Sequence, residues 1–172
     1  MTSYDVFESL IIECNEALFE SYGLTVEHSP NAEREEIWEE DLSLAGIIGF
    51  TSKELRGSLV LGVSDSILAK IDASATSHRD WIQELANQLL GRAKNRLLRF
   101  GVEIQMTTPL SMRGLHLVLE ARSAEARPLL FRTRDGGAIC ALPDVEIKPG
   151  FELVEDPSLD AECPSEGDML LF

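Results

Sequence analysis

Residues 78–100, with the sequence HRDWIQELANQLLGRAKNRLLRF, contain the pattern from which the rest of the fold can be predicted. Apolar side chains recur there every three or four residues, which is the period of one helix face. We therefore expect a long amphipathic helix with one buried side. The residues predicted to face the core are Trp81, Ile82, Leu85, Ala86, Leu89, Leu90, Ala93, Leu97 and Phe100.

The opposite side of this helix carries a polar stripe, which consists of Asp80, Glu84, Asn87 and Gly91. Spacings of four, three and four residues keep these positions within about 60° of one another around the helix axis. Gly91 matters because glycine inside a helix costs about 1 kcal/mol relative to alanine. Two interpretations follow. Either the stripe is an ordinary exposed face and Gly91 packs against a neighbouring strand, or it is a binding surface on which Gly91 lets a partner's backbone approach closely.

Further helices and strands are predicted on both sides of the long helix. Residues 4–22 have a second helical period, with Thr2 or Ser3 placed to cap the helix and Gly23 placed to end it. Short runs of branched and aromatic residues predict strands. In chain order, the other expected elements are an extended piece at 24–27, a solvated acidic insert at about 29–41, a hairpin of strands at 44–50 and 57–63, a short helix capped by Ser64, and strands at 102–107, 115–121, 129–133 and 138–142.

This order of elements predicts the α+β class. Runs of consecutive strands favour a mostly antiparallel sheet, covered on one face by the two long helices. Residues 1–143 are expected to form one domain, and residues 144–172, acidic and rich in proline, an appended tail. The tail ends in the apolar run DMLLF at 168–172, which either folds back onto the sheet or serves as a peptide ligand for a groove on another protein.

The composition argues against several classes of partner. The 30 acidic and 15 basic residues give a net charge of −15, which repels nucleic acid and anionic membranes. No apolar run approaches the roughly 20 residues of a membrane span, and the acidic first residues differ from a basic signal peptide. The three cysteines and three histidines stand far apart, at no ligand spacing. We expect a cytoplasmic protein with no metal and no cofactor of its own.

The hairpin at 44–64 and the segment at 80–109 together resemble the CheX and CheC family of chemotaxis phosphatases, and the likeness covers about residues 5–142. The signature of that family is an Asp or Ser, three residues, Glu, two residues, Asn, about twenty-two residues and Pro. Asp80, Glu84 and Asn87 match the signature in type and spacing. Pro109 matches its last position, about one residue short of the usual interval.

The resemblance implies a CheX-like fold and hydrolysis of the aspartyl phosphate on a CheY-type response-regulator receiver domain, whose own Mg²⁺ neutralises the phosphoryl oxygens. In that reaction Asn87 would position the attacking water, and Glu84 would anchor the partner by pairing with the receiver's lysine. Asp80 would either add to the anchoring or stabilise the helix N-terminus through the macrodipole. The alternative is a non-catalytic docking module that binds a receiver domain or a flagellar-switch protein through the same stripe.

Some members of this family carry a second copy of the motif on their first long helix. Here Ser9 and Glu13 stand at its first two positions, but Glu16 occupies the place of the asparagine. Asn15 is displaced from that place by about 100° of rotation. We therefore predict that Glu13 and Asn15 are ordinary helix surface and that the chain has one site. One site per chain resembles CheX, which in that family forms homodimers by joining sheets, so we expect a homodimer.

Overall fold

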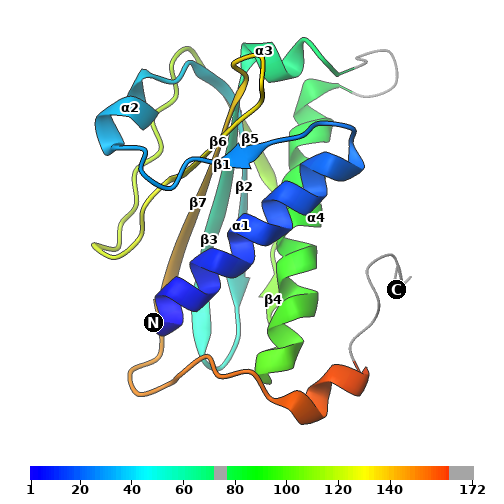
Figure 1. Cartoon of the computed structure of the whole chain (residues 1–172), viewed down its shortest axis with the longest axis vertical. Coiled ribbons are helices and arrows are strands. Elements are labelled where there is room, and N and C mark those ends of the chain that lie inside the picture. Colours follow the sequence, from blue (N-terminus) through cyan, green and yellow to red (C-terminus); the bar gives the residue numbers. More distant parts are fainter. Residues whose placement is uncertain (72–76, 163–172) are drawn as a thin grey trace.

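The computed structural model describes residues 1–71 and 77–162 (Figure 1). Its elements are α1 (Ser3–Ser21), β1 (Glu27–His28), α2 (Arg34–Glu39), β2 (Leu42–Thr51), β3 (Leu55–Ser64), α3 (Asp65–Leu68), α4 (His78–Leu97), η1 (Leu98–Phe100), β4 (Gln105–Met106), β5 (Leu110–Arg113), β6 (Leu129–Arg132), β7 (Ala138–Ile147) and η2 (Pro157–Glu162). Within the described residues the strands form one seven-stranded sheet in the order β1-β6-β7-β3-β2-β4, with β5 also paired to β2. All of these pairings are antiparallel, so the predicted α+β class is confirmed.

Helix α1 begins at a capping box. The hydroxyl oxygen of Thr2 accepts a hydrogen bond from the backbone N–H of Asp5 (3.2 Å), and the Asp5 carboxylate accepts one from the N–H of Thr2 (2.6 Å). These two bonds hold the pKa of Asp5 below its ordinary value. At the other end, Gly23 has a φ of 75°, a left-handed conformation that stops the helix. The predicted cap at Thr2 and stop at Gly23 are confirmed.

Helix α4 lies beside α1, and the two helices cover the same face of the sheet (Figure 1). Ser77 caps it, because its hydroxyl oxygen accepts a hydrogen bond from the N–H of Asp80 at 3.2 Å. The residues predicted to face the core, from Trp81 to Leu97, are all buried, and Phe100 packs against the same core. The long amphipathic helix and its inward face are therefore confirmed.

Strand β2 has no side chain at the point where α4 crosses it. A Cβ atom added to Gly46 would lie 2.6 Å from the carbonyl oxygen of Ile82 and 3.0 Å from the Cβ of Ala86. Both neighbours belong to α4, so the helix backbone rests directly on the strand. This contact fixes the height of α4 above the sheet.

The expectation of a purely solvated acidic insert at 29–41 is wrong. The insert contains the short helix α2, and Ile37 within it is buried at 5% exposure. Ile37 packs with Leu130 and Cys140 on the face of the sheet opposite α1 and α4. Arg132 on β6 forms ion pairs with acidic residues of this segment. The burial of Ile37, with Ala32 packed against the same cluster, and these ion pairs fasten the charged stretch to the sheet.

The strand predicted at 115–121 is also wrong. The chain pairs with β2 earlier, through β5, and leaves the sheet after it. His116 then adopts a φ of 54°, and Leu117 and Leu119 pack with residues on the second face of the sheet. Their alternation imitates a strand, but β2 already pairs with β3 on one side and with β4 and β5 on the other. The N–H of Leu117 still donates to the carbonyl oxygen of Leu42 on β2 at 2.7 Å, but the regular pairing has ended at β5.

Strand β7 continues past the boundary expected at residue 143. It runs to Ile147, and the chain then returns along the ends of α1 and α4. Leu153 is buried, and its N–H donates a hydrogen bond to the hydroxyl oxygen of Ser3 at 2.9 Å. The first part of the expected tail is therefore packed against the core. The DMLLF segment at 168–172 lies outside the described residues, and both interpretations of it stay open.

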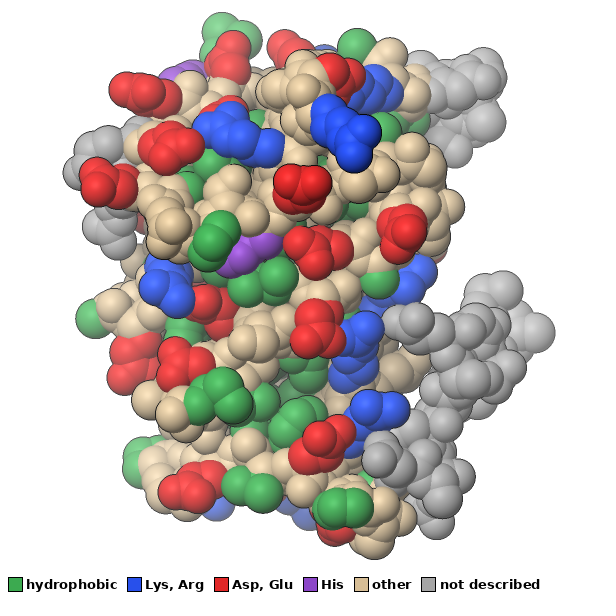
Figure 2. Space-filling view, viewed as in Figure 1, with side chains coloured by type: hydrophobic (Ala, Val, Ile, Leu, Met, Phe, Trp, Pro, Cys, Tyr) green, Lys and Arg blue, Asp and Glu red, His purple; other side chains and the backbone are tan. Residues whose placement is uncertain are grey.

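Acidic side chains are spread over the face of the molecule that α1 crosses (Figure 2). On this face the acidic side chains are not gathered in one patch. None of the described helices is long and apolar enough to cross a bilayer. The described residues also bring no three His, Cys, Asp or Glu side chains together as metal ligands. A surface of this charge attracts cationic groups in a partner.

We expect Gly46→Ala to lower the free energy of unfolding by about 1–3 kcal/mol, because the added methyl group displaces α4 from β2. Urea unfolding followed by circular dichroism measures this change. Gly91→Ala is the matched control: a Cβ there meets nothing within 4 Å, so this change should raise the stability by about 0.5–1 kcal/mol. Unaltered stability of Gly46→Ala would contradict the close packing.

Candidate functional site

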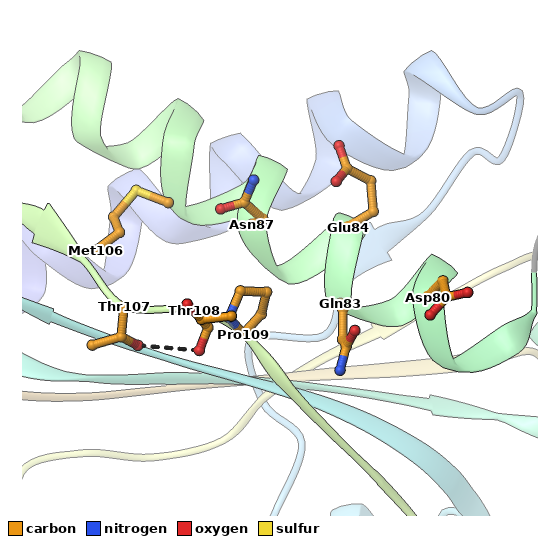
Figure 3. A pocket seen from close by; sticks show the side chains of 8 residues that line it. All are labelled: Asp80, Gln83, Glu84, Asn87, Met106, Thr107, Thr108 and Pro109. Atoms are coloured by element: carbon orange, nitrogen blue, oxygen red, sulfur yellow. Dashed lines mark hydrogen bonds between the residues drawn. The ribbon is translucent and has the colours of Figure 1, made fainter. Parts of the chain in front are cut away.

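An open cleft of about 460 Å³ lies between α4 and the outer edge of the sheet (Figure 3). Its helix side is formed by three of the four residues of the polar stripe, together with one glutamine. Its strand side comes from the end of β4 and the chain that leads into β5. The residues lining the cleft are Asp80, Gln83, Glu84, Asn87, Met106, Thr107, Thr108 and Pro109.

The strand side of the cleft is a break in the edge of the sheet. Strands β4 and β5 both pair with β2, and residues 107–109 bridge the gap between them. Opposite the gap, the N–H of Thr107 donates to the carbonyl oxygen of Gly49, and the N–H of Gly49 donates to the hydroxyl oxygen of Thr107, each at 2.9 Å. Pro109 has no N–H to donate. The Thr107 hydroxyl takes the place of a backbone carbonyl as the acceptor for the Gly49 N–H. Thr108 and Pro109 leave the ladder and line the cleft.

The structure brings Asp80, Glu84 and Asn87 together with Pro109 around this cleft. In Figure 3 the side chains of Glu84 and Asn87 project from α4 in the same direction. Glu84 is exposed and Asn87 is half-buried. Within residues 1–71 and 77–162, the Asn87 amide has no hydrogen-bond partner. A group that approaches the cleft from solvent can therefore meet both side chains.

Gly91, the fourth residue of the polar stripe, lies one turn beyond Asn87 and outside the lining of the cleft. A Cβ atom added there would meet no heavy atom within 4 Å. The interpretation that Gly91 packs against a neighbouring strand is therefore wrong for the described part of the chain. The other interpretation, close approach by a partner's backbone, is compatible with this open space.

A neighbour on the same helix holds the carboxylate of Glu84. Gln88 Nε2 donates a hydrogen bond to Oε1 of Glu84 at 2.8 Å, and Gln88 Oε1 accepts one from the hydroxyl of Tyr22 at 3.1 Å. Tyr22 follows the last residue of α1 and is 43% exposed. Sequence reasoning missed both contacts. The spacing of four residues between Glu84 and Gln88 was a signal for the first of them, whereas the second joins two helices and has no local signal.

The remaining polar side chains of the helix side have distinct surroundings. Gln83 Nε2 donates a hydrogen bond to the hydroxyl of Ser111 on β5 at 3.4 Å, which links the helix to the edge of the sheet. Asp80 lies in the first turn of α4, and its exposed carboxylate lines the cleft. A carboxylate at that position stabilises the helix N-terminus and also faces any partner. Both predicted roles of Asp80 are compatible with its position.

The lining of the cleft limits the chemistry that it supports. It offers two carboxylates, two amides and two hydroxyls, but no histidine, cysteine or lysine. Such a set accepts hydrogen bonds from a cationic side chain and can orient a water molecule. It contains no nucleophile paired with a general base. The arrangement is suited to recognition and positioning.

The residues tested as a second motif on α1 do not form a matching site. Glu13 is exposed, as predicted, and forms an ion pair with Arg96 at 2.5 Å. The prediction that Asn15 lies on the surface is wrong, because Asn15 is completely buried. Its amide nitrogen and oxygen have no hydrogen-bond partner among the described residues. A rotation of about 100° from the motif position carries this side chain into the core instead of onto the outer face.

No protein-family model and no curated protein sequence matches the chain. Solved structures do match it. Chemotaxis protein CheX from Vibrio vulnificus is similar with a TM-score of 0.65 and 18% identity, over 81% of this chain and 99% of that one. A CheC-like superfamily protein from Shewanella sp. PV-4 is similar with a TM-score of 0.62 and 18% identity, over 81% and 97%. A chain of the CheX–CheY–BeF3–Mg²⁺ complex from Borrelia burgdorferi is similar with a TM-score of 0.62 and 12% identity, also over 81% and 97%.

These likenesses agree with the architecture of the chain. The chain is an α+β protein in which two long helices cover one face of an antiparallel sheet. More narrowly, it has the fold of the CheX and CheC-like chemotaxis proteins. The CheX-like fold implied by the sequence resemblance is therefore confirmed.

Proposed function

We propose that the chain binds the phosphorylated receiver domain of a CheY-type response regulator at the cleft and accelerates hydrolysis of its aspartyl phosphate. The observation that carries the proposal is the exposed Glu84 beside the Asn87 amide, which has no hydrogen-bond partner among the described residues and lies one turn away on the same helix. The shared fold adds support, because the Borrelia burgdorferi CheX of this fold forms a complex with CheY, BeF3 and Mg²⁺.

The proposed reaction requires little covalent chemistry from this chain. Water attacks the phosphorus atom, the bond from phosphorus to the aspartyl oxygen breaks, and inorganic phosphate leaves while the receiver's carboxylate is regenerated. Such transfers depend on positioning and electrostatics. Mg²⁺ bound by the receiver would neutralise the phosphoryl oxygens. Asn87 would enter beside the phosphoryl group, accept a hydrogen bond from the attacking water through Oδ1 and hold that water in line.

Glu84 would anchor the complex. Its Oε1 atom already accepts a hydrogen bond from Gln88, which leaves Oε2 for the ammonium group of the receiver's lysine. Asp80, one turn earlier, would either add to this anchoring or act only on the helix N-terminus. Gly91, two turns later, would let the receiver's backbone come close to α4. The polar stripe thus forms one continuous contact along the helix.

The homodimer and the cytoplasmic location expected from the sequence stay predictions. Strand β5 pairs with β2 and lies at the outer edge of the sheet. Leu110 and Met112 on that strand are 65% and 52% exposed. We propose this edge as the place where two sheets would join.

We expect Asn87→Ala to reduce stimulated dephosphorylation of a receiver domain by at least about 100-fold, because the water loses its orienting group. Phosphate release from a phosphorylated receiver measures the rate, and binding of a receiver loaded with beryllofluoride and Mg²⁺ measures affinity, which should stay within about threefold. Asn95→Ala is the matched control, since Asn95 lies on the same helix but does not line the cleft. Full activity of Asn87→Ala would exclude the water-positioning role.

We expect Glu84→Lys to weaken the receiver complex by about tenfold or more, because two ammonium groups would then face each other. The dissociation constant for the receiver loaded with beryllofluoride measures this effect. Glu103→Lys makes the same change of charge at an exposed position away from the cleft and should have little effect. If both variants bound alike, the anchoring role would be wrong.

We expect Gly91→Gln to separate stability from binding. The longer side chain replaces a helical glycine where the chain leaves open space, so the free energy of unfolding should rise by about 0.5–1 kcal/mol. The same side chain fills the space proposed for the receiver's backbone, so affinity should fall by about fivefold or more. Urea unfolding and receiver binding measure the two effects. Wild-type affinity in this variant would show that no partner approaches Gly91.

A further inference from the structure

A chain of two hydrogen bonds connects the end of α1 to the proposed anchor on α4. The hydroxyl of Tyr22 donates to Oε1 of Gln88 at 3.1 Å, and Nε2 of Gln88 donates to Oε1 of Glu84 at 2.8 Å. Tyr22 and Gln88 are 66 residues apart in sequence. Neither residue lines the cleft, but Gln88 contacts the Glu84 carboxylate, which does, and Tyr22 contacts Gln88.

The position of Tyr22 follows from the way α1 ends and packs. Its N–H donates to the carbonyl oxygen of Phe19 at 3.0 Å in the last turn, and Gly23 then redirects the chain. At the other end of the contact between the helices, Glu13 on α1 pairs with Arg96 on α4. The two contacts are nine residues apart on α1 and eight residues apart on α4, and the two helices run antiparallel to each other. Both contacts fit one placement of α1 against α4 in the shared core, and this placement puts the Tyr22 hydroxyl beside Gln88.

The hydrogen bonds also determine which way the Gln88 amide faces. An amide has an oxygen that accepts and a nitrogen that donates. Because the Glu84 carboxylate only accepts hydrogen bonds, it takes the Nε2–H of Gln88, and Oε1 is left to accept from the Tyr22 hydroxyl. A reversed amide would place its oxygen against the carboxylate and lose the charge-assisted bond. Tyr22 adds a second hydrogen bond to the orientation of Gln88 that supports Glu84.

We propose that Gln88 and Tyr22 are positioning residues that hold the Glu84 carboxylate in place before the receiver domain arrives. The inference rests on the proposed function, in which Glu84 binds the receiver's lysine. With Oε1 of Glu84 engaged by Gln88, Oε2 is presented to the partner in one direction. Without this support the complex must immobilise a free glutamate side chain, which weakens binding by about three- to tenfold.

A double-mutant cycle tests the proposal. Gln88→Leu removes both hydrogen-bonding groups, and Tyr22→Phe removes only the hydroxyl. For the full chain and a receiver loaded with beryllofluoride and Mg²⁺, we expect each variant to raise Kd by about three- to tenfold. The loss should fall on Kd and KM and not on kcat. In a Glu84→Ala background, Gln88→Leu should cause no further loss, because the group that it positions is gone.

A second measurement tests the contact without any receiver. The side-chain amide resonance of Gln88, observed by NMR, should shift in both Glu84→Ala and Tyr22→Phe. Glu20→Gln, an exposed change on the last turn of α1, is the control and should shift it little. If the chemical shift of this amide were unchanged in Glu84→Ala, the proposal would be overturned.

The binding cycle overturns the proposal in two further cases. One is an unchanged Kd for Gln88→Leu while Glu84→Lys weakens the wild-type complex, which leaves the proposed function standing. The other is an equal loss with and without Glu84, which indicates a general effect on folding. If the wild-type chain neither binds receivers nor accelerates hydrolysis, the proposed function fails and this inference fails with it.

Discussion

The packing of α4 on β2 at Gly46 is the contact on which the rest of the site depends. The carbonyl oxygen of Ile82 would lie 2.6 Å from any Cβ at Gly46, so helix and strand meet backbone to backbone. The buried face of α4 cannot lift from the sheet without opening the core. The polar stripe is therefore held at one height above the edge formed by β4 and β5, and the cleft is the space that this separation leaves.

A site of this kind suits a reaction whose reagents come with the partner. The receiver would supply the phosphoryl group and Mg²⁺, and this chain would supply an amide and a carboxylate at a fixed spacing of about one helical turn. A helix is a better support for such a pair than a loop, because its backbone hydrogen bonds hold the backbone rigid. Only the conformations of the two side chains then need to be restricted. The hydrogen bond from Gln88 to Glu84, with Gln88 itself held by Tyr22, reduces part of that remaining freedom.

The sequence predicted the features that depend on local periodicity. The buried face of α4, the polar stripe, the cap at Thr2 and the hairpin of β2 and β3 all follow from spacings within one element. Prediction from the sequence failed where the structure of a segment depends on residues distant in the chain. Residues 115–121 alternate like a strand, but the regular pairing with β2 ends at β5, just before them. Asn15 is polar yet buried, and the contact of Tyr22 with Gln88 needs the packing of two helices, which no local pattern contains.

The break between β4 and β5 has a consequence for the behaviour of the protein in concentrated solution. An outer strand with an unbroken row of free backbone groups is a template on which other chains can add strands and form aggregates. Here the edge consists of the two short strands β4 and β5, and Pro109 between them lacks an N–H. Only short stretches on either side remain for pairing. The residues that form one wall of the cleft thus also discourage the growth of fibrous assemblies along this edge.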